Sequence, residues 1–423
     1  MPNATTAQAS ASLGRIMLLV LLPFGSGYFL SYLFRAVNAV VAPDLVREIG
    51  LSASGLGLLT AAYLFAFAAF QLPLGILLDR YGPRRVQTFM LLTAGTGALL
   101  FGIAESEAAL IAARALIGLG FAGGLMASFK AVAEWAPPGR MPLLNSWVMA
   151  FGGVGVIAAS TPADLAVQEF GWRAVFIALA ACTALAALAI WTFVPRRGEG
   201  RTGGHESFGS QLKALGTIYS DREFWRVVPL ITTLCASHIA VQTLWAGPWL
   251  ADVAGLDRDA VAFTLTLMAV AFTVGVLGSG AITDWVRRFG YGPLDVMIAT
   301  TVIYVISVAA LILAPAAWYL PLWLVFAATG QLGILGYPHV AEHFGAALAG
   351  RASTAINLLV FGGAFAIQYG FGAVLDQWPS NEGGGYPAEA YAVALGICLA
   401  MLIVSLVWFF MAKKPKAIRA GQV

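Results

Sequence analysis

Long apolar runs, separated by short charged, proline-rich or glycine-rich segments, make up most of the chain. A helix that crosses a bilayer needs about 20 mostly apolar residues, and many of these runs reach that length with few or no charges. Breaking the chain at the polar segments predicts helices over 16–42, 54–78, 85–104, 108–133, 145–166, 172–194, 226–250, 260–282, 292–314, 318–338, 351–375 and 388–412. The pattern therefore predicts an all-α polytopic membrane protein with twelve transmembrane helices.

The longest hydrophilic stretch lies between the sixth and seventh predicted helices. It is rich in arginine, lysine and glycine, and a short surface helix is expected in it from about Ser210 to Tyr219. We therefore expect two six-helix bundles joined by a solvated linker. The predicted units are an N-terminal bundle at 1–194, a cytoplasmic linker at 195–225 and a C-terminal bundle at 226–423.

The basic residues indicate how the helices cross the membrane. With the N-terminus inside, most arginines and lysines fall on the cytoplasmic side, and only Arg47, Arg173 and Arg258 fall on the other. Because cytoplasmic loops carry an excess of Lys and Arg, both termini are expected in the cytoplasm, in a bacterial-type inner membrane. The first apolar run is longer than the apolar part of a signal peptide, so it is expected to remain as the first helix.

Composition narrows the function classes. Hydrophobic residues make up 60% of the chain, charged residues 11%, and the net charge is +3, so no nucleic-acid partner is expected. Cys182, Cys235 and Cys398 lie within apolar runs, and His339 and His343 have no third ligand nearby, so neither a metal nor a disulfide is predicted. No phosphate-cradling loop is present either. We therefore expect no cofactor; membrane lipid is the expected surrounding and a monomer the expected state.

A weak internal repeat relates the two halves. A constant offset of 205 residues, as between Gly50 and Gly255 (255 − 50), also aligns proline, phenylalanine and aspartate residues. The aligned pairs include Pro43 with Pro248, Phe67 with Phe272, and Asp79 with Asp284. Such a register predicts two homologous bundles related by pseudo-two-fold symmetry, with a ligand site between them.

One loop carries a recognisable signature. The segment Gly75-Ile-Leu-Leu-Asp79-Arg80-Tyr-Gly82-Pro-Arg84-Arg85 resembles the signature between helices two and three of the major facilitator superfamily. A degenerate second copy, Gly280-Ala-Ile-Thr-Asp284, and the helix-four pattern Arg114-Ala-Leu-Ile-Gly118-Leu-Gly120 support the resemblance, which covers nearly the whole chain. It implies a secondary carrier that works by rocker-switch alternating access, similar to organic-anion branches of the superfamily.

The same loop implies a gate. Asp79, at the cytoplasmic end of helix two, is expected to face the positive N-terminal end of helix eleven near 352–354 and to latch the halves together. In the superfamily an arginine of this loop pairs with an acidic residue at the end of helix four, where Glu134 fits. The gating candidates are Gly75, Asp79, Arg80, Gly82, Arg84, Arg85, Glu134 and Asp284. The alternative is that the arginines only fix the topology.

Charges at membrane depth are costly and usually functional. Arg35 and Arg114 have about the same predicted depth in helices one and four, which line the central cavity in the superfamily. Tyr28 and Tyr32 share a helical face with Arg35, and Asn38 lies at its edge. With no carboxylate nearby, these arginines would suit an anionic ligand.

Lys130, a third deep charge, is expected to reach the interface or to pair with Glu134 at the cytoplasmic end of helix four. Its depth suits a gate-side contact better than a ligand contact.

The second half offers polar residues for the same cavity. His238, Gln242 and Trp245 share a face of helix seven, and Gln331 and Asn357 lie on helices ten and eleven. No Asp or Glu lies near the centre of a span, so a carboxylate proton relay is missing. His238 is the candidate for proton coupling; an exchanger or a uniporter is the alternative.

Together these features predict a secondary active transporter for a small organic anion of the carboxylate type. A multidrug or metabolite efflux antiporter is the nearest alternative, although helix five lacks the Gly-Pro signature of drug exporters and no central carboxylate awaits a cation. A polytopic membrane enzyme or receptor is a weaker alternative, because no cluster of catalytic groups is visible.

Overall fold

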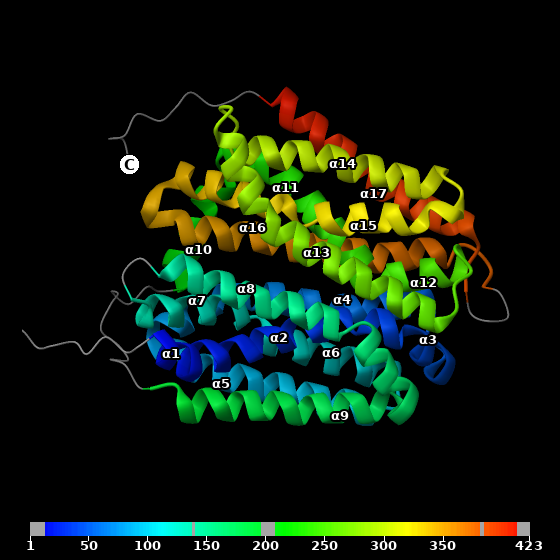
Figure 1. The fold of residues 1–423 in the computed structure, drawn as a ribbon, viewed down its shortest axis with the longest axis horizontal. Coiled ribbons are helices and arrows are strands. Elements are labelled where there is room, and N and C mark those ends of the chain that lie inside the picture. Colours follow the sequence, from blue (N-terminus) through cyan, green and yellow to red (C-terminus); the bar gives the residue numbers. More distant parts are fainter. Residues whose placement is uncertain (1–12, 138–139, 196–207, 381–384, 413–423) are drawn as a thin grey trace, which may run out of the picture.

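The computed structural model describes residues 13–137, 140–195, 208–380 and 385–412, and within these ranges every regular element is helical (Figure 1). Ten helices are long and apolar enough to cross a membrane, and two shorter apolar helices accompany them. The predicted all-α membrane fold is therefore confirmed. The two chain ends and residues 196–207 of the predicted linker lie outside the described residues.

The N-terminal half occupies the lower part of Figure 1 and the C-terminal half the upper part. The first half consists of α1 (Leu13–Ile16), a π-helical turn (Met17–Leu21), α2 (Leu22–Ala36), α3 (Asn38–Ile49), α4 (Ala53–Ala69), α5 (Gln71–Ile103), α6 (Glu107–Phe121), α7 (Gly124–Trp135), α8 (Met141–Ala158) and α9 (Thr161–Phe193). The second half follows α10 (Phe208–Tyr219), which lies where the linker helix was predicted. It consists of α11 (Arg222–Ala240), a π-helical turn (Val241–Trp245), α12 (Ala246–Asp252), α13 (Arg258–Arg287), α14 (Pro293–Leu313), a 3-10 turn (Ala316–Trp318), α15 (Tyr319–Thr329), a second 3-10 turn (Leu332–Gly336), α16 (Tyr337–Leu375) and α17 (Ala388–Met411).

The three longest elements each contain a sharp turn at a glycine. These glycines are Gly82 in α5, Gly171 in α9 and Gly345 in α16, with φ angles of 77°, 79° and 71°. Only glycine takes such positive φ angles without a steric penalty, so two helices can be joined there by a sharp turn with no loop between them. Divided at these glycines and joined across their short interruptions, the described helices other than α10 trace twelve segments, and each overlaps one predicted helix. The first segment is longer than predicted, because α3 continues to Ile49.

Backbone irregularities agree with the internal repeat. Gly50, which caps α3, and Gly255, which follows the end of α12, are 205 residues apart (255 − 50) and have positive φ angles, 74° and 67°. The first helix is interrupted at Val37, and the seventh carries the π-helical turn Val241–Trp245, which contains the position 205 residues later (37 + 205 = 242). The two halves therefore share irregular backbone positions. These positions support the internal repeat more clearly than the few matching residues do.

The halves meet most closely where α4 crosses α16. A Cβ atom added to Gly57 would lie 2.8 Å from the carbonyl oxygen of Gln368, and one added to Gly372 would lie 2.3 Å from the carbonyl oxygen of Ala53. Both distances are too short for a real side chain. Small residues thus let these two backbones touch, as is common between membrane helices.

Asp376, just beyond α16, caps the start of α4 in the other half. Its carboxylate accepts hydrogen bonds from the backbone N–H groups of Ala53 and Ser54, at 3.0 and 2.9 Å, and from the hydroxyl of Tyr386 at 2.7 Å. Burial alone would raise the pKa of Asp376, but the hydrogen bonds from Ser54 and Tyr386 hold it below its usual value. A carboxylate at a helix N-terminus is stabilised by the helix dipole, so this contact joins the two halves electrostatically.

A second contact lies at the same end of the molecule. Arg258, at the start of α13, donates to Asp44 at 3.0 Å and to Asp164 at 2.7 Å, and both acceptors belong to the other half. The hydroxyls of Thr161 and Thr266 also meet, at 2.8 Å. We call the end that carries the Asp376 and Arg258 contacts the distal end.

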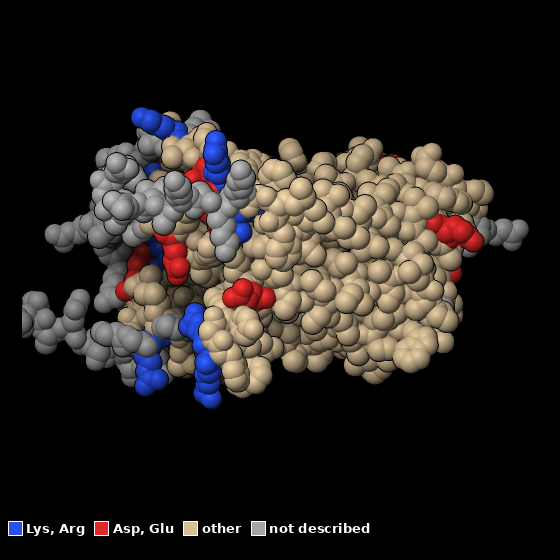
Figure 2. Space-filling view, turned by 90° about the horizontal axis from the view of Figure 1, so that it is seen from above, with Lys and Arg blue, Asp and Glu red and all other residues tan. Residues whose placement is uncertain are grey.

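The opposite end carries most of the basic side chains visible on the face drawn in Figure 2, and we call it the basic end. Helix α7 reaches this end (Figure 1). Lys130 lies here and pairs with Asp79 at 2.5 Å, while its Nζ also donates to the Leu78 carbonyl at 2.9 Å. Asp79 thus pairs within its own half in this structure, and its expected contact with the eleventh helix stays a prediction.

Substituting Gly372 should open the distal end. A Gly372→Val side chain would overlap the Ala53 carbonyl, so the variant should show longer distances between the halves at this end. Pulsed electron paramagnetic resonance with one spin label on each half measures this. Gly370→Val is the matched control, because a Cβ at Gly370 meets no atom within 4 Å among the described residues. Equal distances in both variants would contradict the close-packing role.

Candidate functional site

A cavity lies between the two halves. Its N-terminal wall comes from α2, α3 and the junction of α8 with α9, and its C-terminal wall from α11, the adjoining π-helical turn, α13 and the end of α15. The lining residues are Tyr32, Arg35, Ala36, Ala39, Val40, Val156, Ala159, Ser160, His238, Ile239, Gln242, Thr243, Leu265, Phe272 and Gln331. In a carrier built from two homologous halves, the ligand site is expected in this position, at the interface of the halves.

Four helix interruptions surround this cavity. They are Val37, the pair Ala159 and Ser160, the π-helical turn Val241–Trp245, and the pair Gly330 and Gln331. Irregular backbone at membrane depth is tolerated only where protein covers it or where it lines a cavity. Four of the interruptions among the described helices therefore lie beside this cavity.

Arg35 is a charged side chain without a countercharge in this lining. It is 8% exposed, and its Nε has no hydrogen-bond partner among the described residues. Its guanidinium carbon lies 4.7 Å from the ring centre of Tyr32 and 5.2 Å from those of Phe67 and Phe361. Such cation–π contacts are worth about 0.5–2 kcal/mol each, whereas taking an ion out of water costs several kcal/mol. The charge is therefore under-compensated.

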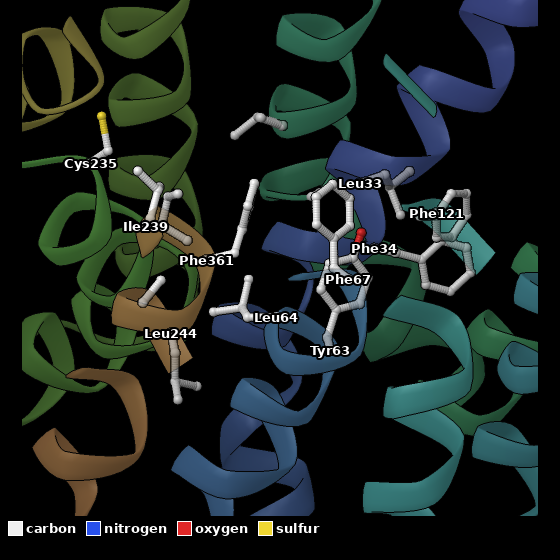
Figure 3. Packing of buried hydrophobic residues seen from close by; sticks show 14 of the residues in the cluster. Leu33, Phe34, Tyr63, Leu64, Phe67, Phe121, Cys235, Ile239, Leu244 and Phe361 are labelled. Atoms are coloured by element: carbon white, nitrogen blue, oxygen red, sulfur yellow. The ribbon is translucent and has the colours of Figure 1, made fainter. Parts of the chain in front are cut away.

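The aromatic rings around Arg35 come from both halves. Phe67 of α4 and Phe361 of α16 lie with their ring centres 4.4 Å apart. Figure 3 shows Phe361 projecting between the halves toward the side that carries Leu64 and Phe67. A movement of one half against the other would therefore change the surroundings of Arg35.

The C-terminal wall offers unpaired hydrogen-bonding atoms. His238 lies against the rings of Phe272 and Phe326, at 5.8 and 5.5 Å between ring centres. Its Nδ1 and the Oε1 of Gln242 have no partner among the described residues. With Gln331 beside them in the lining, these neutral groups can bind a polar part of a ligand.

Arg114 has a different environment from Arg35. It is 0% exposed, and both terminal nitrogens donate to the carbonyl oxygen of Phe34 at 3.1 Å. Phe34 lies in the last turn of α2, whose carbonyls lack the donors of a following turn. Arg114 therefore supports the helix interruption beside Arg35 and lies outside the cavity lining, contrary to the expectation that it faces the ligand.

The predicted substrate residues divide into two groups. The cavity brings together Tyr32, Arg35, His238, Gln242 and Gln331. The others bind neighbouring groups: Tyr28 contacts the sulfur of Met149 at 3.7 Å, Asn38 donates to Thr60 at 2.9 Å, Trp245 donates to the Gln368 carbonyl at 3.1 Å, and Asn357 accepts from Tyr337 at 2.8 Å. Those four therefore support the walls.

The predicted gating residues gather at the basic end. Gly82 makes the turn, Arg84 donates to the Trp191 carbonyl, and Arg80 lies over its neighbour Tyr81. The remaining candidates are placed as follows: Gly75 lies in α5, Asp79 pairs with Lys130, Arg85 follows the turn, Glu134 ends α7, and Asp284 pairs with Arg287 at 3.5 Å. Their role in a gate stays a prediction.

The family model of the Major Facilitator Superfamily matches residues 24–368. The chain belongs to this superfamily. The match covers most of both halves and the linker between them. Members of the superfamily are transporters.

Curated superfamily members align with part of this chain. A probable sulfoacetate transporter, SauU, from Cupriavidus necator is 26% identical over 276 residues, which are 62% of this chain and 63% of that protein. A probable L-galactonate transporter from Escherichia coli is 23% identical over 69% of this chain and 67% of that protein. The multidrug resistance protein Stp from Mycobacterium tuberculosis is 30% identical over 39% of this chain and 31% of its own length.

Solved structures of superfamily members share the fold over nearly the whole chain. A bacterial homologue of the human lysosomal transporter Spinster, in an inward-facing and unoccupied conformation, matches with a TM-score of 0.75 at 18% identity, covering 95% of this chain and 97% of that one. A D-xylose–proton symporter matches with a TM-score of 0.73 at 16% identity over 93% and 97%.

Sequence reasoning missed the aromatic and small polar parts of the site. Phe272, Ser160 and Thr243 line the cavity, and Phe67 contacts Arg35. The internal repeat contained a signal for two of them, because Phe67 and Phe272 occupy equivalent positions (67 + 205 = 272). One of these rings lies against Arg35 and the other against His238, so the repeat marks both walls.

The two arginines should differ in what they do for stability. Arg114→Gln removes the guanidinium that bonds the Phe34 carbonyl and should cost roughly 2 kcal/mol. Arg35→Gln removes an under-compensated charge, so the melting temperature should stay the same or rise. Thermal unfolding of both purified variants in one detergent measures the difference. A larger loss for Arg35→Gln would contradict these assignments.

Proposed function

We propose that this protein carries a small organic anion of the carboxylate type across the membrane by exposing its central cavity to one side at a time. The observation that carries the proposal is Arg35, a buried guanidinium in the cavity lining without a countercharge. A guanidinium offers a fork of donors that matches a carboxylate. A bound anion would supply the charge that the surrounding rings cannot.

Two further observations favour an anion. The described lining contains no Asp or Glu, so it has no carboxylate for a cationic ligand. Two relatives also bear names that refer to anions, sulfoacetate and L-galactonate. The identity to these relatives is low, so the physical argument from Arg35 carries more weight.

The contacts between the halves suggest how each of two alternative states would be held. At the distal end, Asp376 and Arg258 hold the halves together in this structure. We propose that the opposite state is held at the basic end, where Asp79 would release Lys130 and cap the start of the eleventh helix near Ala352. The basic end then faces the cytoplasm, as the excess of Arg and Lys indicates. Both termini lie there, in a bacterial-type inner membrane.

A ligand screen tests the class of substrate. Carboxylates should raise the melting temperature of the wild-type protein, while Arg35→Gln should bind them at least about tenfold more weakly, since a charged hydrogen-bonded pair is worth about 1.5–3 kcal/mol. Arg140→Gln, which changes an exposed arginine at the basic end, is the control and should match the wild type. Inorganic phosphate and the cationic drug ethidium complete the screen. Stabilisation by the cation alone would support the multidrug alternative that the relative Stp represents.

The charge of Arg35 also bears on the energy source. A loaded cavity contains a neutral pair, whereas an empty cavity contains a bare guanidinium that disfavours closure over it. We therefore propose exchange of one anion for another. Proton symport through His238 is the alternative, although the rings of Phe272 and Phe326 offer a protonated imidazole no countercharge.

Transport in proteoliposomes separates the two energy sources. For exchange, uptake of a labelled carboxylate should rise several-fold when the vesicles contain unlabelled carboxylate, and an inward proton gradient should have little effect. His238→Gln should keep this exchange. Uptake that follows the proton gradient in the wild type, and loses that dependence in His238→Gln, would instead establish proton symport.

A further inference from the structure

The charge and polarity of the cavity walls point to a narrower class of ligand than carboxylates in general. Arg35 is the only charged side chain among the described lining residues. Apolar side chains make up most of the remaining wall: Ala36, Ala39, Val40, Val156, Ala159, Ile239, Leu265 and Phe272. A ligand that fills this space must therefore place most of its surface against hydrocarbon.

Charge balance limits the ligand to one ionised group. One guanidinium neutralises one carboxylate, and Arg114 cannot serve a second, because both of its terminal nitrogens already bond the Phe34 carbonyl outside the lining. A second carboxylate on the ligand would lose its hydration in the cavity and find no cation to pair with. Burying an unpaired charge is far more costly than burying a neutral group.

Hydrogen-bond accounting limits the number of hydroxyl groups. Ser160 and Thr243 donate their hydroxyl protons to carbonyls of their own helices, those of Val156 and Ile239, at 3.1 and 2.7 Å. Each hydroxyl is then left as an acceptor. The other polar side chains of the described lining are Tyr32, His238, Gln242 and Gln331, and the Nδ1 of His238 and the Oε1 of Gln242 are unpaired. These few groups can bind a polar part of a ligand, whereas the apolar side chains that make up the rest of the lining offer no partner to further hydroxyl groups.

We infer that the transported anion is a monocarboxylate with an apolar body, and that the cavity disfavours dicarboxylates and polyhydroxylated acids. Its carboxylate binds Arg35 on the N-terminal wall, and its hydrocarbon part lies against Val40, Val156, Leu265 and Phe272. This inference rests on the proposed function and names the substrate class of the same site.

Isothermal titration of the purified protein tests the inference. The probes are sodium hexanoate, benzoate, succinate and gluconate, at one pH near 7.5 and one ionic strength, so that every carboxylate is ionised. Hexanoate and benzoate should bind at least tenfold more tightly than succinate and gluconate, and Arg35→Gln should remove this binding. The same titrations with Arg35→Gln also correct for partition of the probes into detergent.

The outcomes separate this inference from the proposed function. If succinate or gluconate binds as tightly as hexanoate and needs Arg35, the inference is wrong while anion transport stands. If no carboxylate binds, or if binding ignores Arg35→Gln, the proposed function itself fails.

A gain-of-function variant provides a second test. Gln242→Lys places a cation of similar length on the C-terminal wall, so the affinity for succinate should rise about tenfold relative to hexanoate. Gln242→Met, which has a similar length and no charge, measures the effect of losing the amide, so that any difference between the two variants reports the added charge. A folded Gln242→Lys variant with unchanged preference would show that charge count does not select the ligand.

Discussion

The structure depends on one buried positive charge, that of Arg35, which has no carboxylate partner among the described residues. The guanidinium of Arg35 lies between the halves, held by the rings of Tyr32, Phe67 and Phe361. Rings stabilise a cation weakly compared with water, so the arrangement keeps the site attractive for an anion. Because one of the rings belongs to the other half, the state of the cavity and the relative position of the halves are physically connected.

The contact between α4 and α16 gives this connection a mechanical basis. Close approach at Gly57 and Gly372 brings the backbones together, and Asp376 caps the first turn of α4 at the distal end. The proposed inner latch would involve the same two membrane segments with their roles exchanged. Asp79 lies in α5 shortly before the turn at Gly82, at the other end of the segment that α4 begins, and it would cap the start of the eleventh helix. A carboxylate at a helix terminus is easily released and re-formed, because each bond is modest and solvent can replace it.

Much of the fold could be predicted, because membrane helices reveal themselves by length and polarity. The twelve segments, the surface helix near Ser210 and the turn at Gly82 follow from local sequence. The site was harder. Arg35 and Arg114 share residue type and expected depth, yet Arg114 bonds the Phe34 carbonyl, which depends on an interruption at Val37 that no hydrophobic pattern marks. Likewise, Lys130 was expected to reach the interface or to pair with Glu134, whereas in this structure it pairs with Asp79 of α5.

The same distinction explains why one buried arginine can serve stability and the other function. Two hydrogen bonds to one carbonyl fix Arg114 in place, and its charge offsets the negative end of an interrupted helix. The Nε of each arginine is unpaired, but among the described residues no backbone carbonyl holds Arg35, which lies one residue after the carbonyl that Arg114 binds. Arg114 therefore fixes the backbone conformation from which the Arg35 side chain projects. A ligand then completes the second site, and the free energy of that pairing is available to move the halves.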